Sequence, residues 1–235
     1  MSLLKEALRA AGGVDRWSQL QRFTVHVSMA GSIFARRGWS GLLKDLVIEG
    51  STKSQSLQIT GFTAPDRRGF YCPDRVAIEG SDGRLLGERD HPRASFSGHP
   101  VWDPLHLAYY CGYSIWNCLT VPFILADPDF YTEELPPWHE DGEIWRRLKV
   151  MFPSRVATHS TEQIFYFDRS GVQRRVDYTS ALSGYVRISQ YSWAHQRFSG
   201  LLVPTLYRSQ CIDINAKILP IPVVLDLEIF DASFI

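Results

Sequence analysis

The chain has no bias of charge and no recognisable catalytic motif. Lys plus Arg and Asp plus Glu both number 25 in 235 residues, so the formal net charge is zero. The general electrostatic argument for binding nucleic acid or an anionic membrane is therefore missing. Gly-x-Ser-x-Gly, Gly-x-Gly-x-x-Gly and Walker sequences do not occur, so a serine hydrolase or a nucleotide-binding enzyme has no support. We expect no cofactor.

Metal-binding spacing is also missing. The four cysteines form no Cys-x-x-Cys pair, and His91, His99 and His106 recur without a recognised ligand spacing. We therefore expect no zinc site, and interpret the cysteines as small buried hydrophobes in a reducing compartment. They are Cys72, Cys111, Cys118 and Cys211.

The N-terminal residues lack the basic start and apolar run of a secretory signal. Their pattern predicts an amphipathic helix over Leu3–Ala11 that stops at Gly12-Gly13, with Asp15 capping a short second turn through Leu20. The sequence as it stands predicts a cytoplasmic protein. If a native signal peptide has been removed from it, the location is periplasmic or otherwise extracytoplasmic.

Basic residues are missing from one long stretch. Residues 94–145 contain no Lys or Arg but eight acidic residues, which are Asp103, Asp127, Asp129, Glu133, Glu134, Glu140, Asp141 and Glu143. This pattern predicts either one acidic surface face or the mouth of a site that repels anions and suits a neutral or cationic ligand.

β-Strand patterns make up most of the chain. Phe23, Val25, Val27 and Met29 alternate with polar or small residues, which is typical of a half-buried strand. Residues 163–178 predict a hairpin. There the Asp168 carboxylate accepts a bond from the backbone two residues on, and Gly171 takes the left-handed conformation.

Further strands are expected in both halves of the chain. Together they predict a mainly β protein with α, built as a single curved antiparallel sheet of about ten strands that forms an open half-barrel over residues 1–235. We expect Pro136-Pro137 to end one strand, and Pro204 to mark an edge or bulge. The other expected strands cover residues 42–48, 57–62, 75–79, 85–86, 130–135, 144–152, 185–191, 201–208 and 223–229.

One apolar block, residues 102–126, breaks the strand pattern. Asp103-Pro104 is typical of a helix N-cap followed by proline in the first turn, and Pro122 is expected to kink or end the helix. Residues 105–126 are nominally long enough to span a bilayer, but polar residues interrupt them and no basic flank lies nearby. We expect no membrane span. Instead, we expect a buried helix that covers the concave face of the sheet.

This block also supplies the candidate ligand-binding residues. They are His106, Tyr109, Tyr110, Tyr113, Trp116 and Phe123. Such an aromatic stripe is either core or the wall of an apolar pocket with a few polar groups. Asp103 and His106 lie three residues apart on the helix. They form either its cap and a satisfied buried histidine or, in an enzyme, an acid–base pair.

Several motifs resemble the LolA-like lipoprotein-sorting proteins. They are Ala-Gly-Gly-Val-Asp-Arg-Trp at residues 11–17, the hairpin at 165–178 and Gly-Leu-Leu-Val-Pro-Thr at 200–205. The Trp-Asp-x-Leu-His-Leu-Ala-Tyr segment at 102–109 is similar to that of an uncharacterised bacterial group with this fold. The resemblance implies an open antiparallel half-barrel closed by helices, with acyl chains bound between them.

Three functional hypotheses follow. The leading one is non-enzymatic binding or carriage of a hydrophobic or amphipathic, lipid-like small molecule. The first alternative is an enzyme that acts on a small hydrophobic substrate in the same cavity, with Asp103 and His106 as its catalytic pair. The second alternative is a partner-binding module that uses an open sheet edge. The sequence leaves the oligomeric state and the identity of the ligand open.

Overall fold

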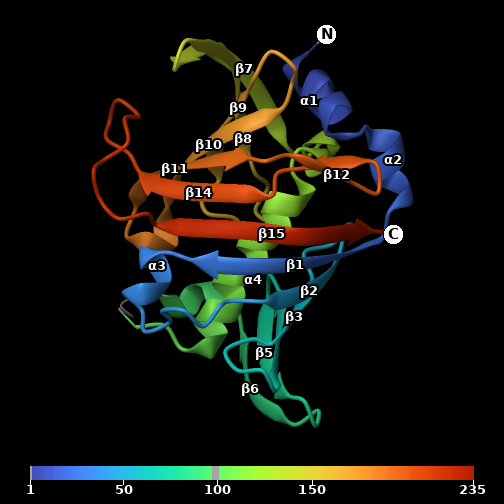
Figure 1. The fold of residues 1–235 in the computed structure, drawn as a ribbon, viewed down its shortest axis with the longest axis vertical. Coiled ribbons are helices and arrows are strands. Elements are labelled where there is room, and N and C mark those ends of the chain that lie inside the picture. Colours follow the sequence, from blue (N-terminus) through green and yellow to red (C-terminus); the bar gives the residue numbers. More distant parts are fainter. Residues whose placement is uncertain (1, 97–100) are drawn as a thin grey trace.

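Thirteen antiparallel strands form one sheet in the computed structural model, which describes residues 2–96 and 101–235 (Figure 1). Their spatial order is β6-β5-β4-β3-β2-β1-β15-β14-β11-β10-β9-β8-β7. The strands are β1 (Arg22–Ala30), β2 (Leu46–Ser51), β3 (Leu57–Thr60), β4 (Arg67–Cys72), β5 (Arg75–Gly80), β6 (Leu85–Asp90), β7 (Tyr131–Glu140), β8 (Glu143–Met151), β9 (Glu162–Phe167), β10 (Gln173–Ser180), β11 (Val186–Trp193), β14 (Leu206–Cys211) and β15 (Leu225–Phe234).

The remaining elements are short, apart from one helix. A second small sheet pairs β12 (Gln196–Phe198) with β13 (Leu201–Val203). The helices are α1 (Leu3–Ala11), α2 (Val14–Gln19), α3 (Ser32–Ala35) and α4 (Pro104–Thr120), with 3₁₀ turns η1 (Pro92–Phe96), η2 (Phe123–Ala126) and η3 (Ala181–Ser183).

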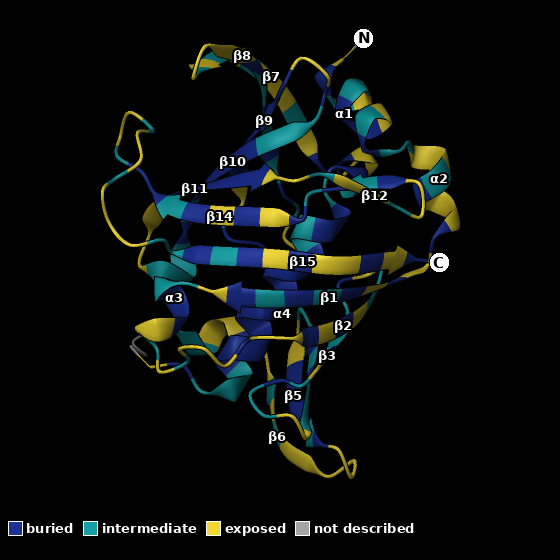
Figure 2. Cartoon of the chain, in the orientation of Figure 1, coloured by how far each residue is buried: buried dark blue, intermediate teal, exposed yellow. Residues whose placement is uncertain are grey.

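The large sheet is curved and unclosed, with β6 and β7 as its two edges. It bends around α4, which lies behind the central strands and is buried along nearly its whole length (Figures 1 and 2). This arrangement confirms the predicted half-barrel and its helical cover.

The ends of α4 follow from local sequence. The Asp103 carboxylate accepts a hydrogen bond from the backbone N–H of His106 at 2.9 Å, and the His106 ring in turn accepts from the Asp103 backbone N–H at 3.3 Å. This reciprocal pair is a capping box. Pro104 occupies the first turn, and the helix ends before Pro122, as the sequence predicts.

Gly112 allows α4 to approach the sheet closely. A Cβ atom at this position would lie 2.2 Å from the Tyr71 ring on β4. Glycine is therefore needed here because the backbone of the helix and the side chain of the strand share one space. This close contact fixes α4 against the β4–β5 part of the sheet.

The first and last strands of the chain pair at the middle of the sheet. Phe23 of β1 lies opposite Phe234 of β15, and both side chains are buried. Leu225, Leu227 and Ile229 face the core, as expected. One extra residue, Phe230, forms a bulge opposite His26 and Val27.

The β9–β10 hairpin is confirmed in detail. The Asp168 carboxylate accepts a hydrogen bond from the Ser170 N–H at 2.8 Å. Gly171 has a φ of +79°, the left-handed conformation that glycine adopts without a steric penalty.

Three predicted boundaries were wrong. Pro136-Pro137 does not end β7, because this edge strand passes the prolines through a bulge between Leu135 and Trp138 and needs no inward N–H there. Strand β2 begins at Leu46 rather than Leu42. The cap of α2 is Gly13, and Asp15 makes no capping bond but lies within the first turn.

Two further differences concern the count of strands. The strand β4 was not predicted, because Gly69 interrupts its apolar alternation; the ring of Phe62 covers this glycine. The expected strand over residues 201–208 is two strands, β13 and β14, which belong to different sheets on either side of Pro204.

Candidate functional site

The six aromatic and histidine side chains predicted to bind a ligand are all buried. Most of them pack against the half of the molecule that contains strands β1–β6 and the helices α2 and α3. The Trp116 indole N–H donates to the Ser51 carbonyl at the end of β2 at 2.8 Å. Phe123 stacks on Trp17 with ring centroids 4.5 Å apart, and Tyr110 packs edge-on to Phe34. Their assignment to a ligand stays a prediction.

Asp103 and His106 do lie together, with Oδ1 and Nδ1 2.8 Å apart. The Arg89 guanidinium also binds both oxygens of Asp103. Partial burial alone would raise the pKa of Asp103, but the hydrogen bonds from Arg89 and from the His106 backbone outweigh it and lower the pKa to about 2. The carboxylate therefore caps the helix, as one of the two interpretations predicts, and it also forms an ion pair with Arg89 that the sequence did not indicate.

Three hollows adjoin one another on the opposite side of α4. The first is an open groove of about 690 Å³ between η1 and the β8–β9 segment, and Tyr109 lines it. It shares Phe152 and Thr158 with an enclosed cavity of about 30 Å³. That cavity shares Cys118 and Tyr207 with another of about 30 Å³ that reaches α1 and the β9–β10 turn.

One face of α4 borders the two enclosed cavities. Ser114, Asn117, Cys118 and Val121 recur at helical spacing and line them. Ser114, Cys118 and Val121 were not among the predicted binding residues, because the prediction followed the aromatic content of the helix. The signal of this face is a run of small side chains at positions i, i+3, i+4 and i+7 within an otherwise aromatic helix.

The central enclosed cavity is polar but uncharged. The Gln163 amide donates to the Ser160 carbonyl at 3.2 Å, and the Gln190 amide donates to the Ser209 hydroxyl at 3.2 Å. The Ser114 hydroxyl is buried and has no hydrogen-bond partner among the described residues. Such a group has a free donor and acceptor for a ligand.

His159 contributes a neutral ring to this cavity. Its Nδ1 lies 3.0 Å from the Tyr113 hydroxyl, and its ring stacks on Tyr178 with centroids 4.3 Å apart. Burial, reinforced by the nearby charge of Arg93, lowers the pKa of His159 to about 3. The ring is therefore uncharged at neutral pH.

The acidic stretch is largely neutralised by arginines from elsewhere in the chain. Arg155 pairs with Asp127 and Asp129, and Arg146 pairs with Glu134. Because these partners are distant in sequence, composition could not reveal them. This pairing removes much of the support for a mouth that repels anions.

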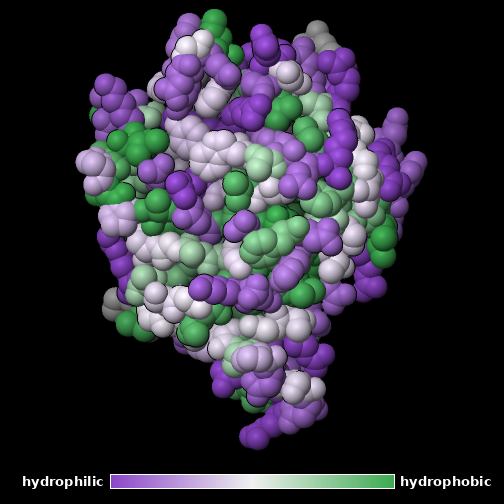
Figure 3. All heavy atoms as spheres, in the orientation of Figure 1, coloured by the Kyte–Doolittle hydropathy of each residue, from purple (hydrophilic) through white to green (hydrophobic). Residues whose placement is uncertain are grey.

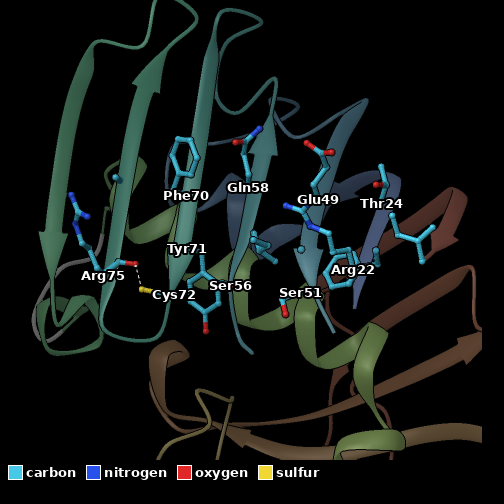
Figure 4. Close-up of a pocket in the computed structure, with 15 residues that line it drawn as sticks. Arg22, Thr24, Glu49, Ser51, Ser56, Gln58, Phe70, Tyr71, Cys72 and Arg75 are labelled. Carbon is cyan, nitrogen blue, oxygen red and sulfur yellow. Dashed lines mark hydrogen bonds between the residues drawn. The ribbon is translucent and has the colours of Figure 1, made fainter. Parts of the chain in front are cut away.

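Another hollow, of about 460 Å³, lies at the ends of β1–β5 (Figure 4). Its lining includes Glu49, Gln58 and Phe70, which are cross-strand neighbours on the outer face of the sheet. Side chains of both charge signs, including Arg22 and Arg75, surround it. It is separate from the space beside α4.

Among the described residues, no group of three or more His, Cys, Asp or Glu side chains is placed to hold a metal ion. His99 lies outside the described residues. Within the same part of the chain, no helix is both long and apolar enough to cross a bilayer.

No sequence-family model and no curated protein matches the chain, but solved structures do. It is similar to a DUF1329 family protein from Desulfovibrio piger, with 11% identity, a TM-score of 0.57, and coverage of 100% of this chain and 94% of that one. A LolA superfamily protein from Nitrosomonas europaea has 11% identity, a TM-score of 0.52, and coverage of 96% and 90%.

A third structure agrees with these two. It is a putative outer membrane lipoprotein-sorting protein domain from Vibrio parahaemolyticus, with 8% identity, a TM-score of 0.53, and coverage of 99% of this chain and 90% of that one. At such low identity the likeness concerns the fold alone. The chain therefore has a LolA-like fold.

Proposed function

We propose that the protein binds and carries an amphipathic, lipid-like ligand beside α4. The observation that carries this proposal is the series of adjoining hollows, from the open groove to α1. Phe165, Val176 and Val121 supply apolar walls to the central cavity. Burial of apolar surface there stabilises a complex by about 25 cal/mol per Å².

The polar groups favour a separate place for each part of the proposed ligand. Ser114, Gln163 and Gln190 suit an uncharged polar group, such as a hydroxyl or a carbonyl of an ester or amide, because no charged side chain lines the enclosed cavity. Arg93 and Asp74 line the open groove, where a charged head group stays in contact with water.

The enclosed cavities have room for only one or two water-sized groups each. An acyl chain therefore requires a wider space than this closed form provides. Phe152 and Thr158 separate the groove from the interior. We expect the β8–β9 segment to move outward when a ligand enters.

An extracytoplasmic location fits the proposal better than a cytoplasmic one. A solved neighbour is described as an outer membrane lipoprotein-sorting domain. Cell fractionation of the protein expressed from its own gene tests this. Recovery in the cytoplasm alone would contradict it.

Native mass spectrometry of the purified full chain, followed by titration with a fluorescent fatty acid, tests the binding function. We expect a co-purified lipid, or at least saturable binding of the probe. Cys118→Leu should weaken probe binding at least tenfold because the larger side chain fills both enclosed cavities. Cys118→Ala is the matched control, since it removes only one atom and keeps the space open.

The same assay separates the alternatives. His106→Ala should change probe affinity by less than about 1 kcal/mol, the usual net contribution of one hydrogen bond. If Trp116→Ala weakens binding and Cys118→Leu does not, the ligand lies on the aromatic side of α4. Failure of any probe to bind, together with a hydrolytic activity that His106→Ala abolishes, would replace carriage with the enzyme hypothesis.

A further inference from the structure

The β14–β15 loop, residues 212–224, exposes three isoleucines. Ile214 is 85% exposed, Ile218 45% and Ile221 43%. In Figure 3, hydrophobic side chains gather at the left side of the molecule, where this loop projects in Figure 1. Single exposed apolar residues are common on protein surfaces, but a cluster on one projecting loop indicates an interaction site.

Internal hydrogen bonds fix the shape of the loop tip. The Asp213 carboxylate accepts from the backbone N–H groups of Asn215 at 2.8 Å and Lys217 at 2.9 Å. Ile212 and Ile218 form a β-bridge below them. Ile214 is therefore held outward by a closed turn.

A buried cation anchors the same tip. Arg175 on β10 is only 1% exposed, and it donates a hydrogen bond to the Ala216 carbonyl at 3.1 Å. Asp177 and Glu140 both form ion pairs with it, with Nε–Oδ1 and Nη1–Oε2 distances of 2.7 and 2.9 Å. The rings of Trp138, Tyr166 and Tyr191 surround its guanidinium at 4.8 to 5.3 Å.

Removing one partner of a buried ion pair strongly destabilises a protein, so Arg175 is held in one position. Its hydrogen bond to Ala216 therefore fixes the position of the loop tip. The fold thus uses a fully satisfied buried arginine to hold a loop whose outermost side chain is apolar.

Further apolar and cationic side chains lie beside the loop. Tyr185 is 77% exposed, and its neighbour Arg187 accepts a backbone hydrogen bond from Ile212 at 3.0 Å. Lys217 is on the loop itself, and Arg36 lies close enough to Cys211 to influence its thiol.

Within the described part of the chain, neither Arg36, Arg187 nor Lys217 forms an ion pair, and Asp213 is engaged by the loop backbone. Glu162 and Asp177, which share a hollow with Arg187, pair with Lys149 and Arg175. Three positive charges without an ion-pair partner among the described residues, on Arg36, Arg187 and Lys217, therefore outnumber the one negative charge of Asp213 around the isoleucines.

We propose that the β14–β15 loop docks the protein on an anionic lipid bilayer. Ile214, Ile218 and Ile221 enter the interface between head groups and acyl chains, while Lys217, Arg187 and Arg36 contact anionic head groups. A narrow aliphatic tip with a cationic base suits a bilayer better than a protein, whose interfaces use broad patches rich in aromatic residues. This surface is distinct from the cavities beside α4, so it goes beyond the proposed carriage.

Vesicle co-sedimentation of the full chain tests the proposal. We expect binding to vesicles that contain phosphatidylglycerol, weaker binding to pure phosphatidylcholine, and a decrease with added salt. Ile214→Ser should weaken binding about tenfold because one buried aliphatic side chain is lost. Lys217→Glu should weaken binding mainly at low salt.

Leu86→Ser is the matched control, since Leu86 is 48% exposed on β6, the edge strand far from the loop (Figure 1). It should bind vesicles like the parent. Equal binding by Ile214→Ser and the parent, or no vesicle binding at all, would overturn the proposal. So would a parent that dimerises in sedimentation velocity and becomes monomeric in Ile214→Ser, because the loop is then a contact between copies. None of these outcomes depends on whether the cavities bind a fatty-acid probe.

Discussion

Gly171, in the β9–β10 turn, lies so close to helix α1 that there is little room for a side chain. Its backbone is left-handed, and a Cβ atom there would lie 3.0 Å from the Glu6 carbonyl oxygen of α1. A substitution therefore meets two costs, the conformational cost of a positive φ and the displacement of α1. The sequence predicted the first, while the second depends on tertiary contact.

Gly171→Val should destabilise the fold by about 1–2 kcal/mol from the backbone conformation alone, and more if α1 is displaced. Gly142→Val is the matched control, since Gly142 has a similar φ of +82° but open space around its Cβ position. Thermal melts compare them. A Gly171→Val melt like that of the parent would contradict the prediction.

His159 makes stability depend on pH in a defined window. Its pKa is about 3 in the folded protein because burial disfavours the charged ring, against about 6.5 when unfolded. Between these values the unfolded state binds the extra proton, so stability falls as pH decreases from about 6.5 to 3.

His159→Phe should flatten this dependence and keep the stacking on Tyr178. The slope removed is at most about 1.4 kcal/mol per pH unit. Urea unfolding at pH 4.5 and at pH 7 measures the slope for the parent and the variant. His91→Phe is a suitable control because His91 is exposed. Equal slopes in parent and His159→Phe would exclude a neutral buried role for this ring.

At the scale of elements, α4 and the sheet meet at Gly112. Alanine there would push its Cβ into the Tyr71 ring, and overpacking of this kind costs about 1–3 kcal/mol. Gly87→Ala on β6 is the comparison, because its nearest neighbour, the Leu105 side chain, would be 3.8 Å away. Urea unfolding should show a loss for Gly112→Ala and little change for Gly87→Ala. A reversed order would contradict this account of the contact.

The sequence predicted elements with a clear period and failed where long-range contact decides. Strand β1 and helix α4 have strong periodicity, and both were predicted correctly. The β4 strand contains Gly69, which is covered by Phe62 from another segment, so its pattern is incomplete. A proline ends a strand only where its missing backbone N–H would have to bond to a neighbouring strand. β7 is an edge strand, so Pro136 and Pro137 do not end it, but the sequence alone does not show that β7 lies at the edge.

The candidate site was less predictable than the fold. Aromatic content identified α4 as the covering helix, but it could not say which face meets which half of the sheet. The Ser114 face borders the cavities because the larger residues of the helix pack on the other half. Ion pairs such as Arg155 with Asp127 join segments that are distant in the sequence, so composition cannot predict them.

For the whole molecule, continuity of the sheet predicts cooperative unfolding. Tryptophans such as Trp17 and Trp116 report on the β1–β6 half, and Trp145 and Trp193 on the other. Tryptophan fluorescence and far-UV circular dichroism should give coincident denaturation curves, since one sheet without a break joins the halves. Two separated transitions would instead indicate two independently folding units.

The pairing of β1 with β15 has a consequence for synthesis. Because Phe23 lies opposite Phe234, β1 emerges from the ribosome long before its partner exists. Until then one edge of β1 is open, and strands with open edges are prone to wrong pairing. The β1–β15 pair at the centre of the sheet can therefore form only after the twelve strands of this sheet that precede β15 have been synthesised.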